Sequence, residues 1–192
     1  MHPTKEAIFK VAINYVKTGM NLEKVSLEKI TKEANIGKST FYGYFSSKDV
    51  LVEESYIYLI NSYHLRLINN ILCNDFKKSL KNQIAIIIAV TKDAKDIMEA
   101  ILENPYHLST SNKKIYTAIQ NVHYSIKNQM ENIFKLGQEE GIISNKYLEE
   151  KSQYIIKALI TSLSIQFVTS QTSLDEEEII ELIYDVLVSN LQ

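Results

Sequence analysis

Residues that break helices are scarce in this sequence, because its 192 residues include only two prolines and five glycines. A protein built from many short strands needs frequent turns, and Gly and Pro are the residues that most often mark them. Apolar side chains instead recur at helical spacing, and no stretch keeps a strand-like alternation. With 45% hydrophobic and 23% charged residues, the composition is that of a folded globular chain. The sequence therefore predicts an all-α protein.

The apolar pattern and its interruptions predict about nine helices. Gly19 and Gly141 fit the position that follows a helix, and Asn104-Pro105 should stop another. The expected ranges are 4–19, 27–34, 38–44, 47–70, 77–91, 94–103, 112–140, 146–169 and 173 to the C-terminus.

Capping signals support several of these starts. Ser26 fits an N-cap, while Ser46 with Asp49 and Ser173 with Glu176 fit capping boxes. The long helix that starts after Ser46 should join a small N-terminal head to a larger body. We expect a head at residues 1–47 and a body at residues 48–192.

The head contains two short helices joined by the turn Asn35-Ile36-Gly37, which predicts a helix-turn-helix. Such turns usually need one residue at positive φ, and Asn tolerates this after Gly. Phe41 and Phe45 lie one helical turn apart and should point into the core. They should pack there with Val11, Ile30 and Ile36.

This arrangement leaves a polar, partly aromatic face directed outward, made of Lys38, Ser39, Thr40, Tyr42 and Tyr44. Hydroxyl and amine donors bind phosphate oxygens and base edges, so the face suits DNA better than a merely solvated helix. By position, Ser39 and Thr40 are better placed to read bases, and the tyrosines to hold phosphates.

Two further side chains fit phosphate contacts at helix starts. A lysine in the first turn of a helix opposes the helix dipole, so Lys48 should gain nothing structurally and serve phosphate instead. Ser26 is a second candidate clamp. Residues 1–50 carry eight lysines against five acids, which agrees with a head that faces nucleic acid.

Residues 4–51 resemble the DNA-binding head of the TetR family, the tetracycline-repressor-like bacterial transcriptional regulators. The family is usually rich in glycine where this chain has Asn35 and in serine where it has Gly37. The residues that carry the resemblance are Ile30, Ala34, Ile36, Lys38, Thr40, Phe41, Tyr42, Tyr44, Phe45, Lys48 and Leu51.

The resemblance implies a homodimer that binds a palindromic DNA operator and releases it when a small molecule enters the body. It also implies that the last two helices form the dimer bundle. Independently, the apolar stripes of these helices are too wide for one buried face. The dimer candidates are Ile156, Leu159, Leu163, Ile183 and Leu187.

A ligand pocket between body helices would combine aromatic and apolar walls with a few polar groups. The candidates are Tyr63, His123, Met130 and Phe167, which suit a small apolar or aromatic effector. Two alternatives stay open: the body could bind a protein partner instead, or the chain could be a helical enzyme.

Little supports the enzyme alternative. His64, His107 and His123 form no His-x-x-x-His or Glu-x-x-His pair, so neither a metal site nor a cofactor is expected. No signal-peptide pattern occurs, and Cys73 is the single cysteine. We therefore expect a cytoplasmic protein that does not associate with membranes.

Overall fold

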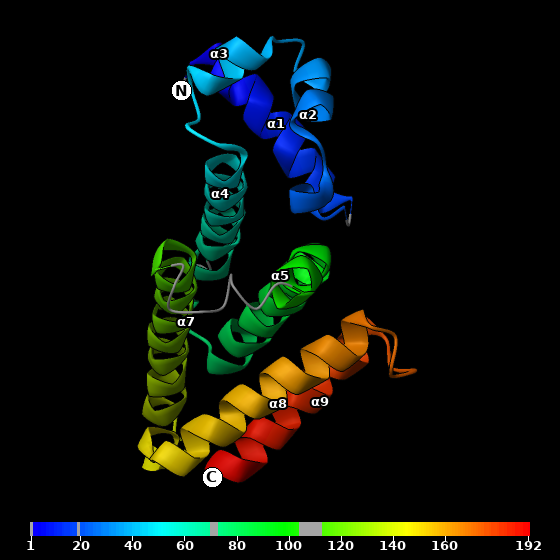
Figure 1. The fold of residues 1–192 in the computed structure, drawn as a ribbon. Helices are drawn as coiled ribbons and strands as arrows, with labels where there is room; N and C mark the ends of the chain where they lie inside the picture. Colours follow the sequence, from blue (N-terminus) through cyan, green and yellow to red (C-terminus); the bar gives the residue numbers. More distant parts are fainter. Residues whose placement is uncertain (1, 19, 70–72, 104–112) are drawn as a thin grey trace. The chain divides into compact units, whose positions relative to one another are not determined.

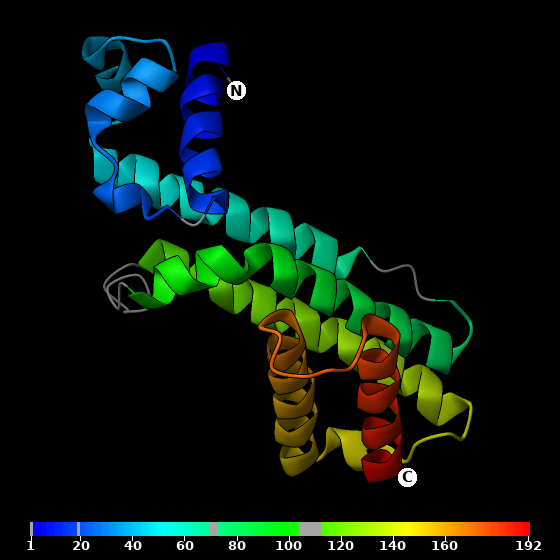
Figure 2. The same cartoon turned by 90° about the vertical axis from the view of Figure 1, so that its right-hand side faces the viewer.

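The computed structural model describes residues 2–18, 20–69, 73–103 and 113–192. These residues form eight α-helices and two short 3-10 turns with no strand among them, which confirms the all-α prediction (Figure 1, Figure 2). In chain order the elements are α1 (Pro3–Lys17), η1 (Leu22–Lys24), α2 (Leu27–Glu33), α3 (Lys38–Tyr42), α4 (Lys48–Ile68), α5 (Phe76–Glu103), α7 (Lys113–Glu139), η2 (Asn145–Leu148), α8 (Glu150–Val168) and α9 (Glu176–Leu191).

Several predicted starts and stops are confirmed. The hydroxyl of Ser26 accepts a hydrogen bond from the Lys29 backbone N–H at 3.2 Å and caps α2. Gly141 follows α7 with φ of 71°, a conformation that favours glycine. The predicted stops at Gly19 and Asn104-Pro105, and also His107, lie outside the described residues.

One predicted break is wrong, because residues 77–91 and 94–103 belong to a single helix, α5. The intervening residues, Lys92 and Asp93, are neither Gly nor Pro, so they do not interrupt the helical hydrogen bonds of the backbone. Asp93 also has partners on α4, because its carboxylate accepts from Arg66 at 2.6 Å and its backbone carbonyl from the Tyr63 hydroxyl at 2.9 Å.

Two predicted caps are shifted along the chain. The Val50 N–H donates to the hydroxyl of Ser47, not Ser46, at 3.2 Å, and α4 begins at Lys48. The capping box of α9 joins Asp175 and Glu178 instead of Ser173 and Glu176. Both motifs fit the spacing in the sequence, and the structure uses the later one in each case.

The predicted helix 146–169 is divided in the structure. Residues 145–148 form the 3-10 turn η2, and Glu149 is extended with φ of −69° and ψ of 136° before α8 begins. Tyr147 in η2 is buried, and its ring centroid lies 5.7 Å from that of Phe134 on α7. Tyr147 thus packs η2 against α7, and the extended Glu149 separates η2 from α8.

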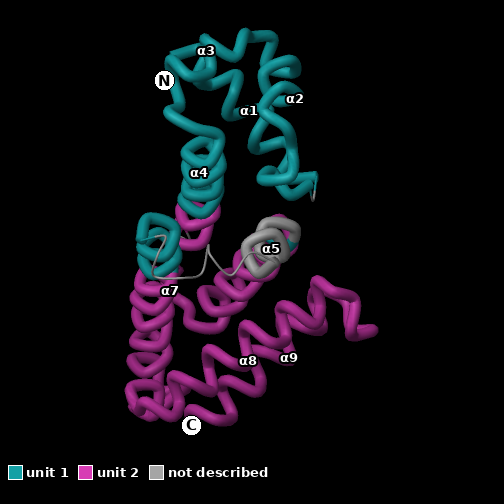
Figure 3. The backbone as a smooth tube through the Cα atoms, viewed as in Figure 1, with its two compact units in different colours: residues 1–62, 94–122 teal, residues 63–93, 123–192 magenta. Residues whose placement is uncertain are grey.

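The chain divides into two compact units (Figure 3). One contains residues 1–62 and 94–122, and the other contains residues 63–93 and 123–192. In the first unit, the aromatic core joins α1 to the segment around α3. Phe9 and Phe45 meet edge to face at 5.5 Å, and Phe41 stacks on Phe45 at 5.4 Å.

The second unit has a larger apolar core. Gly137 on α7 lies directly against the ring of Phe76 at the start of α5, and the Phe76 N–H donates to the Glu140 carboxylate at 2.8 Å. Near the C-terminus, the N–H and hydroxyl of Ser144 both donate to the Leu191 carbonyl. The core residues on its helices include Leu80, Ile84, Ile88, Met130, Ile133, Phe134, Ile156, Ile160, Ile179, Ile183 and Leu187.

Candidate nucleic-acid interface

The predicted helix-turn-helix is present in the first unit, where α2 and α3 are joined by three residues. Asn35 has φ of 53°, the positive value that the sequence predicted for this turn. The Ile36 N–H donates to the Thr31 carbonyl at 3.0 Å, which closes the end of α2. Gly37 is the N-cap of α3 and provides no side-chain hydrogen bond.

The four aromatic residues of this segment divide largely as expected. Phe41 and Phe45 are fully buried, whereas 56% of the Tyr42 surface is exposed. Tyr44 is only half-buried. The helix therefore presents one phenol freely, and the second phenol is partly covered by its surroundings.

Three consecutive residues at the start of α3, Lys38, Ser39 and Thr40, are exposed. The Lys38 ammonium lies 3.7 Å from the Glu28 carboxylate, and both side chains are largely in solvent, at 60% and 79% exposure. Such surface pairs contribute little free energy and are screened by salt. Lys38 can therefore exchange this partner for a phosphate at small cost.

Lys48 has a structural contact that the sequence did not indicate. Its ammonium donates to the backbone carbonyl of Glu23, which follows the start of η1. The expectation that this lysine gains nothing structurally is therefore wrong. An ammonium has three N–H donors, so the contact leaves donors for a phosphate as well.

Ser26 occupies an exposed position at the start of α2. Its oxygen accepts the Lys29 N–H, as described above, and its own O–H proton remains for another acceptor. The side chain thus combines a structural cap with one outward donor.

Tyr44 has a partner from the other end of the head. Its hydroxyl oxygen lies 2.8 Å from Nδ1 of His2, and the two ring centroids are 5.3 Å apart. Nδ1 also accepts the Thr4 backbone N–H at 3.3 Å, which makes His2 the N-cap of α1. Sequence reasoning missed His2 because 42 residues separate the pair and no local pattern connects them.

A second long-range pair joins α1 to α2. The hydroxyl of Tyr15 donates to the Glu33 carboxylate, and the Lys29 ammonium lies 5.1 Å from the centre of the Tyr15 ring. Burial, followed by the hydrogen bond to Glu33, raises the pKa of Tyr15 from its ordinary 10.0 to about 12. This pair fixes the two helices that support α3.

The four predicted ligand residues all belong to the second unit, but they differ in setting. Met130 is in the core, and Phe167 is half-buried against the same core. Tyr63 is bound to the Asp93 carbonyl, with the Arg66 guanidinium 5.9 Å from its ring centre. His123 is exposed as a residue, but part of its ring is buried. This partial burial, and to a smaller extent the positive charge of Lys157, lowers the pKa of His123.

Two other polar atoms in the second unit lie in the interior. Nε2 of His64 on α4 and Oγ of Ser164 on α8 are buried and have no hydrogen-bond partner among the described residues. An unpaired buried polar atom costs free energy, so such atoms often have a functional reason. Their burial could not be inferred from the sequence, since both residues are common on exposed helix faces.

Most of the predicted dimer residues pack in the protomer's own core. Ile156, Ile183 and Leu187 are buried in the core of the second unit, and Leu159 and Leu163 are half-buried against it. The exposed large apolar side chains on these two helices are Tyr154, Ile155, Ile165 and Leu182.

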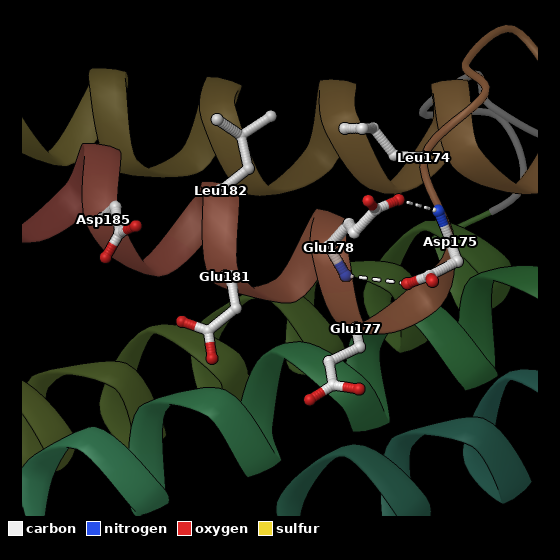
Figure 4. A pocket seen from close by; sticks show the side chains of 7 residues that line it. All are labelled: Leu174, Asp175, Glu177, Glu178, Glu181, Leu182 and Asp185. Carbon is white, nitrogen blue, oxygen red and sulfur yellow. Dashed lines mark hydrogen bonds between the residues drawn. The ribbon is translucent and has the colours of Figure 1, made fainter.

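An acidic depression of about 450 Å³ lies at the start of α9 (Figure 4). Asp175 and Glu178 point toward each other there because they form the capping box, and Glu181 pairs with Lys81 of α5. In the described ranges, no group of three or more His, Cys, Asp or Glu side chains is arranged to hold a metal ion. None of the described helices is long and apolar enough to cross a membrane.

The segment around the helix-turn-helix is similar to that of a known protein family. Residues 21–55 match the family described as "Bacterial regulatory proteins, tetR family", a segment that includes α2, α3 and the start of α4. No curated protein sequence matches the chain.

Solved structures share the fold over almost the full length. A TetR transcription regulator from Haloarcula marismortui is 13% identical, with a TM-score of 0.70 over 100% of this chain and 97% of that one. The fatty acid degradation regulator FadR from Bacillus halodurans is 16% identical, with a TM-score of 0.64 over 100% and 98%. The TetR family regulator PfmR from Thermus thermophilus is 15% identical, with a TM-score of 0.63 over 97% and 98%.

At such identities the structures show the fold, while the matched segment connects the head to a family of DNA-binding regulators. The polar face of α3 lies within that segment. Residues 21–55 are thus similar to the tetR family of bacterial regulatory proteins, and the described chain shares the fold of solved TetR regulators.

Proposed function

We propose that this chain is a TetR family transcriptional repressor that binds a palindromic operator as a homodimer and releases it when a small apolar or aromatic effector binds. The observation that carries the proposal is the exposed face of α3, where Lys38, Ser39, Thr40 and Tyr42 stand on a helix-turn-helix whose phenylalanines are buried. A polar, cationic helix face of this kind suits a major groove. Residues 1–47 would then supply DNA binding, in the cytoplasm.

Within this face, Ser39 and Thr40 are proposed to read bases, because both are exposed in the first turn of α3. Lys38, Tyr42, Lys48 and Ser26 are proposed to hold phosphates. Lys38, Lys48 and Ser26 lie at helix starts and Tyr42 is exposed at the end of α3, and amine and hydroxyl donors of this kind suit positioning contacts to phosphate.

Residues 48–192 are proposed to bind the effector and to form the dimer. Support for a dimer comes from one face of α8, where Ile155, Ala158, Ser162 and Ile165 are exposed at helical spacing. Ala158 and Ser162 are small, so a partner helix could approach closely. Leu182 on α9 is a further exposed apolar residue, and Leu159 and Leu163 would border the contact.

Support for an effector comes from the apolar core together with the buried, unpaired atoms of His64 and Ser164. Such polar groups among apolar side chains could orient a small molecule. Tyr63, Met130 and Phe167 would then contribute apolar or aromatic surface, and His123 would lie nearer the outside.

Binding-site selection tests the operator. Purified chain would be mixed with random duplexes, and the bound fraction sequenced over several rounds. We expect an inverted repeat whose half-sites lie about one helical turn or slightly more apart, because two heads of a dimer dock in successive major grooves. Enrichment of single, unrepeated sites would contradict the dimeric operator.

Release of the selected duplex tests the effector. Medium-chain fatty acids and aromatic dyes would be titrated into the complex, the former because one structurally similar protein is the fatty acid degradation regulator FadR. A compound that lowers affinity for DNA, but does not do so in a His64→Leu variant, would support the pocket. Identical release in both variants would contradict the role of His64.

A further inference from the structure

The hydrogen bonds of His2 fix which of its ring nitrogens carries a proton. The Thr4 backbone N–H can only donate, so Nδ1 accepts from it at 3.3 Å. In a neutral imidazole the ring proton is then on Nε2. The Tyr44 hydroxyl, 2.8 Å from the same Nδ1, must therefore be a donor as well.

This arrangement changes what Tyr44 can offer to DNA. A phenol has one proton, and the proton of Tyr44 is directed to His2, so the hydroxyl has none left for a phosphate oxygen. Tyr44 is also half-buried, unlike the exposed Tyr42. The donor that remains at this corner of the head is Nε2–H of His2, on an exposed residue, with no hydrogen-bond partner among the described residues.

We infer that His2 is the phosphate-binding residue at this corner and that Tyr44 is a positioning residue that orients its ring. The inference rests on the proposed DNA-binding function and changes the role expected for Tyr44. Three features support it: the fixed tautomer, the packing of the two rings at 5.3 Å, and the place of Tyr44 in the segment that carries the other proposed contacts.

Because Nδ1 accepts the Thr4 N–H and Nε2–H is the donor offered to DNA, the His2 contact differs from the ammonium contacts of the lysines. Neutralising a phosphate with a cation releases counterions and steepens the dependence of affinity on salt. A neutral N–H donor adds affinity without that effect. Loss of His2 should therefore weaken binding and leave the salt slope unchanged.

The test uses the full chain and a fluorescent duplex carrying the inverted repeat selected by the wild-type protein, with a scrambled duplex as reference. His2→Ser removes the ring but keeps a strong N-cap for α1, so the fold should be preserved. Tyr44→Phe removes only the hydroxyl. Tyr58→Phe, which removes an exposed hydroxyl from α4 in the same unit, is the matched control.

We expect His2→Ser to bind the selected duplex about tenfold more weakly at an unchanged salt slope. Tyr44→Phe should lose roughly threefold, and the double variant should bind no more weakly than His2→Ser alone, since Tyr44 acts through His2. Tyr58→Phe should match the wild type. His2→Asp, which also caps α1 but repels phosphate, should bind more weakly than His2→Ser.

Wild-type affinity in both His2 variants would overturn the inference, while selective binding by the wild type would leave the proposed function standing. Losses that multiply in the double variant would also overturn it, because Tyr44 would then have a contact of its own. A wild-type chain that binds both duplexes equally would overturn the proposed function itself. Thermal unfolding of each variant separates lost contacts from lost folding.

Discussion

At the scale of single residues, the pairing of Tyr15 with Glu33 gives the head a dependence on alkaline pH. The pKa of Tyr15 in the folded chain is about 12, above the ordinary 10.0, so folding favours the protonated phenol. The stabilisation is therefore fully present below pH 10 and is lost as the pH rises through about 12.

The corresponding prediction concerns Tyr15→Phe. The wild type should be more stable than this variant at neutral pH, and the difference in unfolding free energy should shrink between about pH 10 and 12. Urea unfolding of both proteins across that range measures it, with Tyr58→Phe as the control. A difference that stays constant up to pH 12 would show that the pair does not act as described.

Lys48 donates to the Glu23 carbonyl in the structure, and we propose that it also binds a DNA phosphate. A substitution can separate these two roles. We predict that Lys48→Ala weakens binding to all sequences alike and reduces the magnitude of the salt slope by about one. Binding titrations at several salt concentrations give this slope. If affinity falls but the slope stays the same, Lys48 acts only by holding η1.

Thr40 is the clearest candidate for reading a base, because it is exposed on α3 next to the buried Phe41. Thr40→Ala should relax the preference at one position of each half-site, by about 1–3 kcal/mol at most. Affinities for duplexes that carry all four base pairs at each position measure the change. Equal discrimination before and after the substitution would refute the assignment.

Much of the residue pattern in the head could be predicted, because it depends on local spacing. Phe41 and Phe45 are four residues apart and share a face, and Asn35 is a residue type that tolerates the positive φ needed at the end of α2. The bonds from Tyr44 to His2 and from Lys48 to Glu23 could not be predicted. Each joins residues far apart in the sequence, and the Lys48 partner is a backbone carbonyl, which no pattern of side chains reveals.

At the scale of helices, α7 packs closely against the start of α5 at Gly137. A Cβ atom added at Gly137 would lie 2.7–2.8 Å from three carbons of the Phe76 ring, and this ring is fully buried. The absence of a side chain at Gly137 therefore lets the two helices approach.

We predict that Gly137→Ala destabilises the chain. Alanine gains about 1 kcal/mol in helix propensity, but overpacking against a ring that cannot move costs up to about 3 kcal/mol. Thermal and urea unfolding measure the net loss. In a Phe76→Leu background the same substitution should be neutral or stabilising, and a similar loss in both backgrounds would contradict this explanation.

The positions of the helices could be predicted to within a few residues, but their caps were less certain. Ser173 with Glu176 and Asp175 with Glu178 both fit the spacing of a capping box, so the sequence pattern alone does not choose between them, and the structure has the second. The helix break expected near Lys92 is absent, because a sequence pattern again did not show the contacts made with other helices. Two successive polar residues, Lys92 and Asp93, do not end the helix here, since Asp93 forms an ion pair with Arg66 on the neighbouring helix α4.

At the scale of the whole molecule, the dimer proposal depends on which apolar residues stay exposed. Sequence stripes could indicate a second buried face but could not assign it, because wide stripes do not say which residues face the protomer's own core. Ile183 and Leu187 turned out to be core residues, while Ile155 is 50% exposed.

We therefore predict that Ile155→Lys converts the dimer to a monomer at micromolar concentrations without unfolding it, since an unpaired charge would be buried at the contact. Light scattering with size-exclusion chromatography measures the mass. Leu65→Lys, at a similarly exposed position on α4, is the control and should remain dimeric. A monomeric wild type, or an Ile155→Lys variant of unchanged mass, would contradict the proposed interface.

The central claim is that the exposed face of α3 gives this chain selective binding to DNA. The most direct measurement is the affinity of the purified chain for duplexes that tile its own upstream DNA, compared with scrambled duplexes, at about 50 and 200 mM salt. We predict tight binding to one of the natural duplexes that weakens steeply as salt rises. Equally weak binding to natural and scrambled duplexes at both salt concentrations would contradict the claim.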